Sequence, residues 1–253
     1  IRHREKMEQV SGFKDQAMGA LGNIPPYCVV AEFIGVALFA FLGGACDANS
    51  VSTGLATAAL GNGLCLAILV YATAGISGGH LNPAVSTAFY VTKRLGRPRY
   101  LFYMASQFLG AAFGAVVLRL ALPPTYLDTP FVTRGSMTSA HPIQVFLLEF
   151  ICTFVLTYVV FATAVDRKGA AANAAPLAIG LAVTACLFAE GPFTGGSMNP
   201  ARTVGAAIAF WTFDHLLIYV LATLCGGAAA GWTYDYLYLS DVQPAGSDER
   251  DEE

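Results

Sequence analysis

Long apolar stretches separated by short polar loops dominate this chain. A helix that spans a bilayer needs about 20 mostly apolar residues. Six stretches predict such helices, at roughly 27–48, 54–76, 99–120, 143–165, 175–191 and 215–239. Two further apolar segments, about 82–91 and 199–209, are too short to cross. They predict re-entrant half-helices, which are tolerated only where they line a cavity or pack inside protein.

The composition agrees with an all-α membrane protein. Of the 253 residues, 55% are hydrophobic and 12% are charged, whereas roughly a quarter of a soluble domain is charged. The net charge of −3 shows no footprint for nucleic acid. The six cysteines fall in apolar segments without Cys/His clusters, so we expect no metal site, no cofactor and no disulfide framework.

The distribution of lysine and arginine predicts how the chain is oriented in the membrane. They are concentrated in the first residues, in the loop after the second span (93–99) and in the loop after the fourth (167–168). The positive-inside rule then makes both termini cytoplasmic. We expect a cytoplasmic tail at 1–26, a membrane domain at 27–239 and an acidic cytoplasmic tail at 240–253.

The membrane domain contains an internal repeat, with halves at about 27–120 and 143–239. At a constant offset of 117 residues, Glu32 pairs with Glu149, and Asn82-Pro83-Ala84 pairs with Asn199-Pro200-Ala201. The same offset pairs Gly110 with Gly227 and Gly114 with Gly231, which predicts close helix packing. Each half has three spans, so the second is inserted upside down, and the functional site is expected where the halves meet.

The two Asn-Pro-Ala triplets predict where the half-helices begin. Asparagine is a good N-cap and proline suits the first turn, so the positive helix ends and the amides of Asn82 and Asn199 point toward the centre. A single copy would merely indicate a cap; two repeat-matched copies in apolar surroundings favour a pore. Pore-lining backbone is expected in the segments before them, at Gly78, Gly79, His80, Gly195 and Ser197. A structural turn at Gly78 and Gly79, and a packing role for His80, are the alternatives.

Arg202, Glu32 and Glu149 are charged side chains inside apolar segments. Arg202 follows the second triplet, and its repeat mate is Val85. An arginine in a membrane costs about 2.5–3.5 kcal/mol on insertion scales and usually faces a cavity, so Arg202 is a candidate donor to solutes and a barrier to cations. Glu32 and Glu149 are expected to support the extended segments beside the half-helices, with a proton relay as the alternative.

These motifs resemble the major intrinsic protein family, the aquaporins, over roughly 27–239. The resemblance implies an aquaporin-like inverted repeat that conducts water through a lipid bilayer, assembled as a homotetramer with one pore per subunit. Opposed positive helix ends exclude protons and cations in such pores. The segments 162–166 (ATAVD) and 195–202 (GGSMNPAR) are similar to tonoplast-type aquaporins and to their ammonia-permeable animal relatives. Plasma and vacuolar membranes both remain open.

The resemblance also implies a selectivity filter at Asn62, Leu187, Gly196 and Arg202. Strict water channels carry Phe, His, a small residue and Arg there, so this chain departs at two positions. Small neutral solutes such as ammonia, urea or hydrogen peroxide are therefore expected beside water. The alternatives are a glycerol-permeable channel and a coupled secondary transporter, for which only Glu32 and Glu149 would offer carboxylates. No enzyme is expected, because no nucleophile and base pair is visible.

Overall fold

A computed structural model describes residues 24–127, 133, 141–169 and 172–239. Six helices in these ranges are long and apolar enough to cross a membrane. They are α2 (Pro26–Thr53), α3 (Leu55–Ser77), α5 (Arg97–Ala121), α6 (Pro142–Val160), α7 (Ala175–Thr194) and α9 (Leu216–Tyr234). Helices α6 and α9 continue as one wider turn each, at Phe161–Val165 and Asp235–Leu239.

Two short helices complete the architecture, α4 (Pro83–Val91) and α8 (Pro200–Phe210), with single turns at Pro124–Tyr126 and Ala172–Ala174. The predicted fold class, six spans plus two half-helices, is confirmed. The expected tails lie outside the described residues, except for the last three residues of 1–26.

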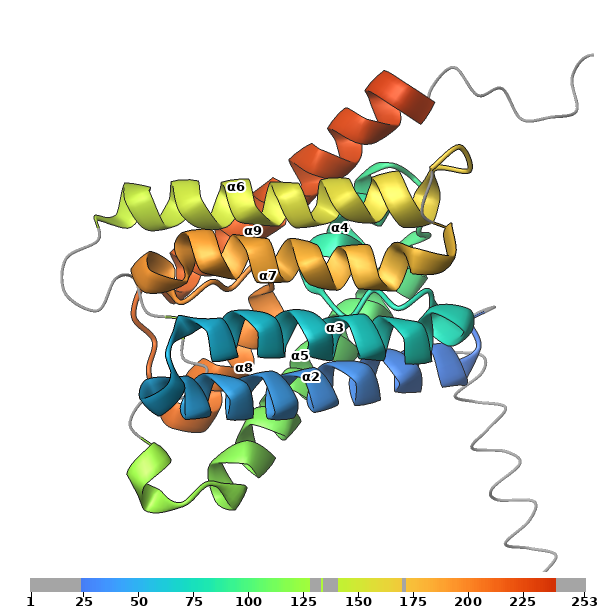
Figure 1. Cartoon of the computed structure of the whole chain (residues 1–253). Coiled ribbons are helices and arrows are strands. Elements are labelled where there is room, and N and C mark those ends of the chain that lie inside the picture. The colour runs from blue at the N-terminus through green and yellow to red at the C-terminus, as the bar shows by residue number, and fades with distance from the viewer. Residues whose placement is uncertain (1–23, 128–132, 134–140, 170–171, 240–253) are drawn as a thin grey trace, which may run out of the picture.

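The long helices run side by side, and the half-helices lie among them, α4 nearer one end of the bundle and α8 nearer the other (Figure 1). Helix α2 packs on α3 and α5, and α6 packs on α7 and α9. The halves are joined mainly by α3 against α7, and each half-helix packs on the last long helix of the other half, α4 on α9 and α8 on α5. The two halves are therefore interlocked.

Glycines allow the closest helix contacts. A Cβ at Gly110 would clash with the carbonyl oxygen of Phe33, and a Cβ at Gly226 would clash with that of Phe150. The expected pairing of Gly110 with Gly227 is therefore wrong by one residue. The last helix is shifted by one position relative to the rest of the repeat, and Gly227 packs instead against α4.

Candidate functional site

The half-helices begin at the Asn-Pro-Ala triplets. The side-chain oxygen of Asn82 accepts from the backbone N–H of Ala84 at 2.8 Å, and that of Asn199 accepts from Ala201 at 3.0 Å. Each asparagine has extended backbone, and a proline fills the first helical position. Both are capped helix starts of the kind that the sequence pattern indicates.

The two asparagines are held by opposite halves of the chain. Asn82 Nδ2 donates to the carbonyl of Met198 at 2.8 Å, and Asn199 Nδ2 donates to the carbonyl of Leu81 at 2.9 Å. An asparagine amide has two N–H donors. One donor of each amide is therefore used to join the half-helix loops, and at most one is left to meet a solute.

The loops before the triplets have matching conformations. The backbone angle φ is 95° at Gly78 and 82° at Gly195, 61° at Gly79 and 64° at Gly196, and 50° at both Leu81 and Met198. Left-handed backbone is uncommon outside glycine. At Leu81 and Met198 it occurs at the two residues whose carbonyls accept the crossed asparagine bonds.

Two buried carboxylates hold these loops. Glu32 accepts from the backbone N–H groups of His80 at 3.0 Å and Leu81 at 2.7 Å. Glu149 accepts from Ser197 and Met198, both at 2.9 Å. Both glutamates are fully buried, and hydrogen bonds to a charged acceptor are stronger than neutral ones. This geometry fits a supporting role for both residues.

A cavity of about 520 Å³ lies on the α4 side of the asparagines. Its lining includes Gly78, Gly79, His80 and Asn82. The ring of His80 packs on Phe89, with centroids 4.4 Å apart. His80 therefore both lines the cavity and packs, so the two roles that sequence left open coexist.

A much smaller cavity, of about 10 Å³, lies on the α8 side. The four positions named by the resemblance meet there, Asn62 from α3, Leu187 from α7, Gly196 from the loop and Arg202 from α8. The other lining residues are Phe39, Leu66, Asn82, Leu156, Val183, Ser197, Met198 and Asn199. A Cβ at Gly196 would clash with the side chain of Leu187, so a larger residue here would require Leu187 to move.

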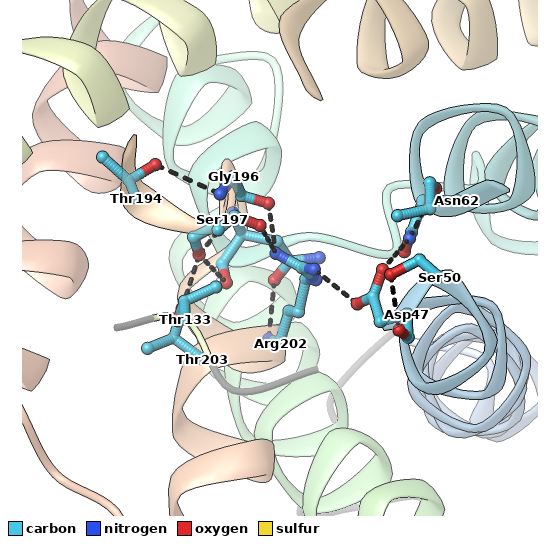
Figure 2. Close-up of polar contacts among 12 residues, drawn as sticks. Asp47, Ser50, Asn62, Thr133, Thr194, Gly196, Ser197, Arg202 and Thr203 are labelled. Atoms are coloured by element: carbon cyan, nitrogen blue, oxygen red, sulfur yellow. Dashed lines mark hydrogen bonds and ion pairs between the residues drawn. The ribbon is translucent and has the colours of Figure 1, made fainter. Parts of the chain in front are cut away.

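The guanidinium of Arg202 is bound on two sides. Its Nη1 donates to the carbonyls of Gly195, at 3.3 Å, and Gly196. Its Nη2 forms an ion pair with Asp47 Oδ2 at 2.9 Å. Figure 2 shows Asp47 between Arg202 and Asn62, whose Nδ2 donates to Asp47 Oδ1 at 2.7 Å. The positive charge expected at this wall therefore has a counterion.

Sequence reasoning missed two acids. Asp47 lies in α2 beside the small cavity, and Glu190 is fully buried near the end of α7. The expectation that only Glu32 and Glu149 would offer carboxylates to a coupled transporter is therefore wrong. The available signal was a charge inside an apolar stretch, but both acids lie near span ends, where side chains commonly reach water.

Six spans around two half-helices that meet at paired Asn-Pro-Ala caps define a membrane channel. The chain belongs to the major intrinsic protein family, whose model matches residues 27–234. It is 37% identical over 250 residues to a probable aquaporin TIP2-1 of Oryza sativa subsp. japonica, covering 90% of this chain and 96% of that protein. It is 37% identical over 236 residues to aquaporin TIP2-3 of Zea mays, covering 87% and 91%.

The fold also matches a solved structure, the aquaglyceroporin from Plasmodium falciparum. The TM-score is 0.73 and the sequence identity 23%, over 83% of this chain and 95% of that one. At this identity the likeness shows a shared fold.

Proposed function

We propose that the chain is a passive water channel that excludes protons and ions. The observation that carries this proposal is the meeting of the α4 and α8 N-termini at Asn82 and Asn199, between the two cavities. Two positive helix ends raise the energy of a cation there. The small cavity has about the volume that one water needs, which favours passage in single file.

The proposal extends to small neutral solutes, with ammonia, urea or hydrogen peroxide as the candidates. Leu187 and Phe39 give the small cavity apolar walls, while Asn62 and Arg202 supply polar groups. A solute with donors and acceptors can then replace lost water contacts at low cost.

Cationic residues support cytoplasmic termini. Lys93 and Arg94 lie between α4 and α5, and Arg97 and Arg99 lie in the first turn of α5. The ion pair of Arg94 with Asp235, at 2.6 Å, ties this loop to the turn that follows α9. Among the described residues, this end of the bundle therefore carries the cationic loop. The TIP-type relatives favour a vacuolar membrane, which imaging of a tagged chain tests.

We also propose a homotetramer. Large apolar side chains are exposed on the outer faces of α2, α3, α6 and α7, and they suit contact with lipid or with further copies. Examples are Leu38, Leu42, Leu60, Leu64, Ile68, Leu147, Ile151 and Leu181. Native mass spectrometry of the detergent-solubilised protein should give a mass of four chains, and a monomer mass would contradict this part.

The test of function is flux in proteoliposomes. Light scattering after an osmotic step should show raised water permeability with a low activation energy, and a pH-sensitive dye inside the vesicles should show no added proton flux. Proton flux that rises with water flux would overturn the proposal. Urea, ammonia, hydrogen peroxide and glycerol are compared in the same vesicles, and their exclusion would limit the channel to water.

A further inference from the structure

A single carboxylate joins two of the four residues around the small cavity. Asp47, from α2, accepts from Asn62 Nδ2 through Oδ1 at 2.7 Å and from Arg202 Nη2 through Oδ2 at 2.9 Å. The side chains of Asp47 and Arg202 are 13% and 3% exposed. Asp47 therefore bridges α3 and α8 from a third helix (Figure 2).

This bridge determines how the amide of Asn62 is turned. Both N–H donors of Asn62 are used, one by Asp47 and the other by the carbonyl of Ala58 at 2.9 Å. The reverse orientation would place the amide oxygen against a carboxylate and a carbonyl, three acceptors without a proton between them. The carboxylate of Asp47 therefore selects one of the two amide orientations.

The selected orientation leaves an acceptor without a partner on a residue that lines the small cavity. Asn62 is 1% exposed and lines that cavity, and its Oδ1 has no hydrogen-bond partner among the described residues. A buried acceptor without a partner costs free energy until a donor arrives. A passing solute with an N–H or O–H group supplies that donor. A water molecule can turn to offer either a hydrogen or its oxygen, whereas an N–H group of urea only donates, so urea depends more on the direction of the amide.

The same bridge also neutralises the charge of Arg202 at the wall of the small cavity. Arg202 faces the carboxylate of Asp47 at 2.9 Å and the carbonyls of Gly195 and Gly196. An ion pair of this kind has no net charge. Asn62 Oδ1 then gives the wall an acceptor that can recognise a solute.

We propose that Asp47 is a positioning residue for solute selection, which turns Asn62 so that its amide oxygen favours small neutral solutes bearing N–H groups, such as urea. This inference rests on the proposed channel function, because it concerns the ratio of urea to water permeability. A site that rejects an analogue lacking its hydrogen-bonding group can discriminate strongly.

The experiment is a double-mutant cycle in proteoliposomes, with urea and water permeability measured on the same preparation. Asp47→Ala should lower the urea-to-water ratio about tenfold, because the amide is then free to turn its N–H groups inward. In an Asn62→Leu background, which has no amide to orient, the same substitution should change the ratio less than twofold. Asp47→Asn, which preserves the shape of the side chain, should lower the ratio in the same direction.

The control is Asp235→Asn, which breaks the ion pair with Arg94, and neither of these residues lines the small cavity. It should leave the ratio unchanged. An equal effect of Asp47→Ala in both backgrounds, or no effect in the parent, would overturn the inference. So would a parent that conducts water and excludes urea, whereas a parent that conducts neither overturns the proposed function itself.

Discussion

Thr73 and Glu190 occupy equivalent places in the two halves, each against the second glycine of its half-helix loop, Gly79 or Gly196. The hydroxyl of Thr73 donates to the carbonyl of Leu69 at 2.7 Å. Glu190 is fully buried, and neither of its carboxyl oxygens has a hydrogen-bond partner among the described residues. One half thus carries a satisfied hydroxyl where the other carries an unsatisfied acid.

Replacing Glu190 should stabilise the protein. Glu190→Met keeps a similar volume and removes polar atoms that cost about 1–3 kcal/mol when buried without partners. At about 2–4 °C for each kcal/mol in a chain of this size, thermal unfolding in detergent should shift upward by several degrees. The matched control, Glu149→Met, should shift it downward, because the N–H groups of Ser197 and Met198 lose their acceptor. A downward shift for both variants would contradict the prediction.

Glu32→Gln should reduce water permeability by about tenfold or more. Glu32 accepts from four donors, the backbone of His80 and Leu81 and the side chains of Ser77 and Gln107. A glutamine would turn an NH₂ group toward donors, leaving buried groups unpaired. The measurement is water flux per reconstituted channel, with gel filtration to show that the variant is folded. Unchanged flux would show that the loop does not need the carboxylate.

Arg202→Val should open the small cavity and admit cations, because Asp47 then loses its counterion and leaves a negative charge at the wall. Adding Asp47→Asn to this variant should remove the cation leak while keeping the wider opening. Vesicle assays of potassium and urea flux separate the two effects. A cation leak that persists in the double variant would show that Asp47 is not its source.

Mercurials should inhibit water flux less than twofold. The sulfur of Cys186 lies 3.6 Å from the carbonyl of Cys152, and neither residue is among those that line the two cavities. Cys46 and Cys225 are more accessible but lie outside both linings. The check is water flux before and after a mercurial. Prompt block that Cys186→Ser abolishes would show that this cysteine reaches the pore.

Restoring the residues typical of strict water channels should suppress solute flux. Asn62→Phe combined with Leu187→His removes the amide and places larger rings at the small cavity. Urea flux should fall at least tenfold while water flux changes little, measured in the same vesicles. A parallel fall in both fluxes would indicate blockage instead of selection.

Much of the pore was predictable because it is built twice from local signals. The asparagine caps, the prolines and the glycines act within a few residues, and the repeat marks Glu32 and Glu149 as a pair. The resemblance brought Asn62, Leu187, Gly196 and Arg202 together, and the structure places all four around one cavity. Their roles in selection stay a prediction.

The contacts that the sequence did not reveal depend on how the helices are rotated and on where they cross. Asp47 reaches Arg202 only because the end of α2 lies beside α8. The one-residue shift of α9, seen at Gly226, is hidden in the sequence because the 117-residue offset also pairs two glycines, Gly110 and Gly227. The crossed asparagine bonds likewise require both half-helices to meet tip to tip.

Those crossed bonds have a consequence for biosynthesis. Met198, the acceptor for Asn82, follows it by 116 residues, so the first loop is translated long before its partner. Until then the amide of Asn82 and the carbonyl of Leu81 lack their final partners. The two half-helix loops can therefore be joined only after the second has been translated, and a chain that ends before it leaves the amide of Asn82 without this partner.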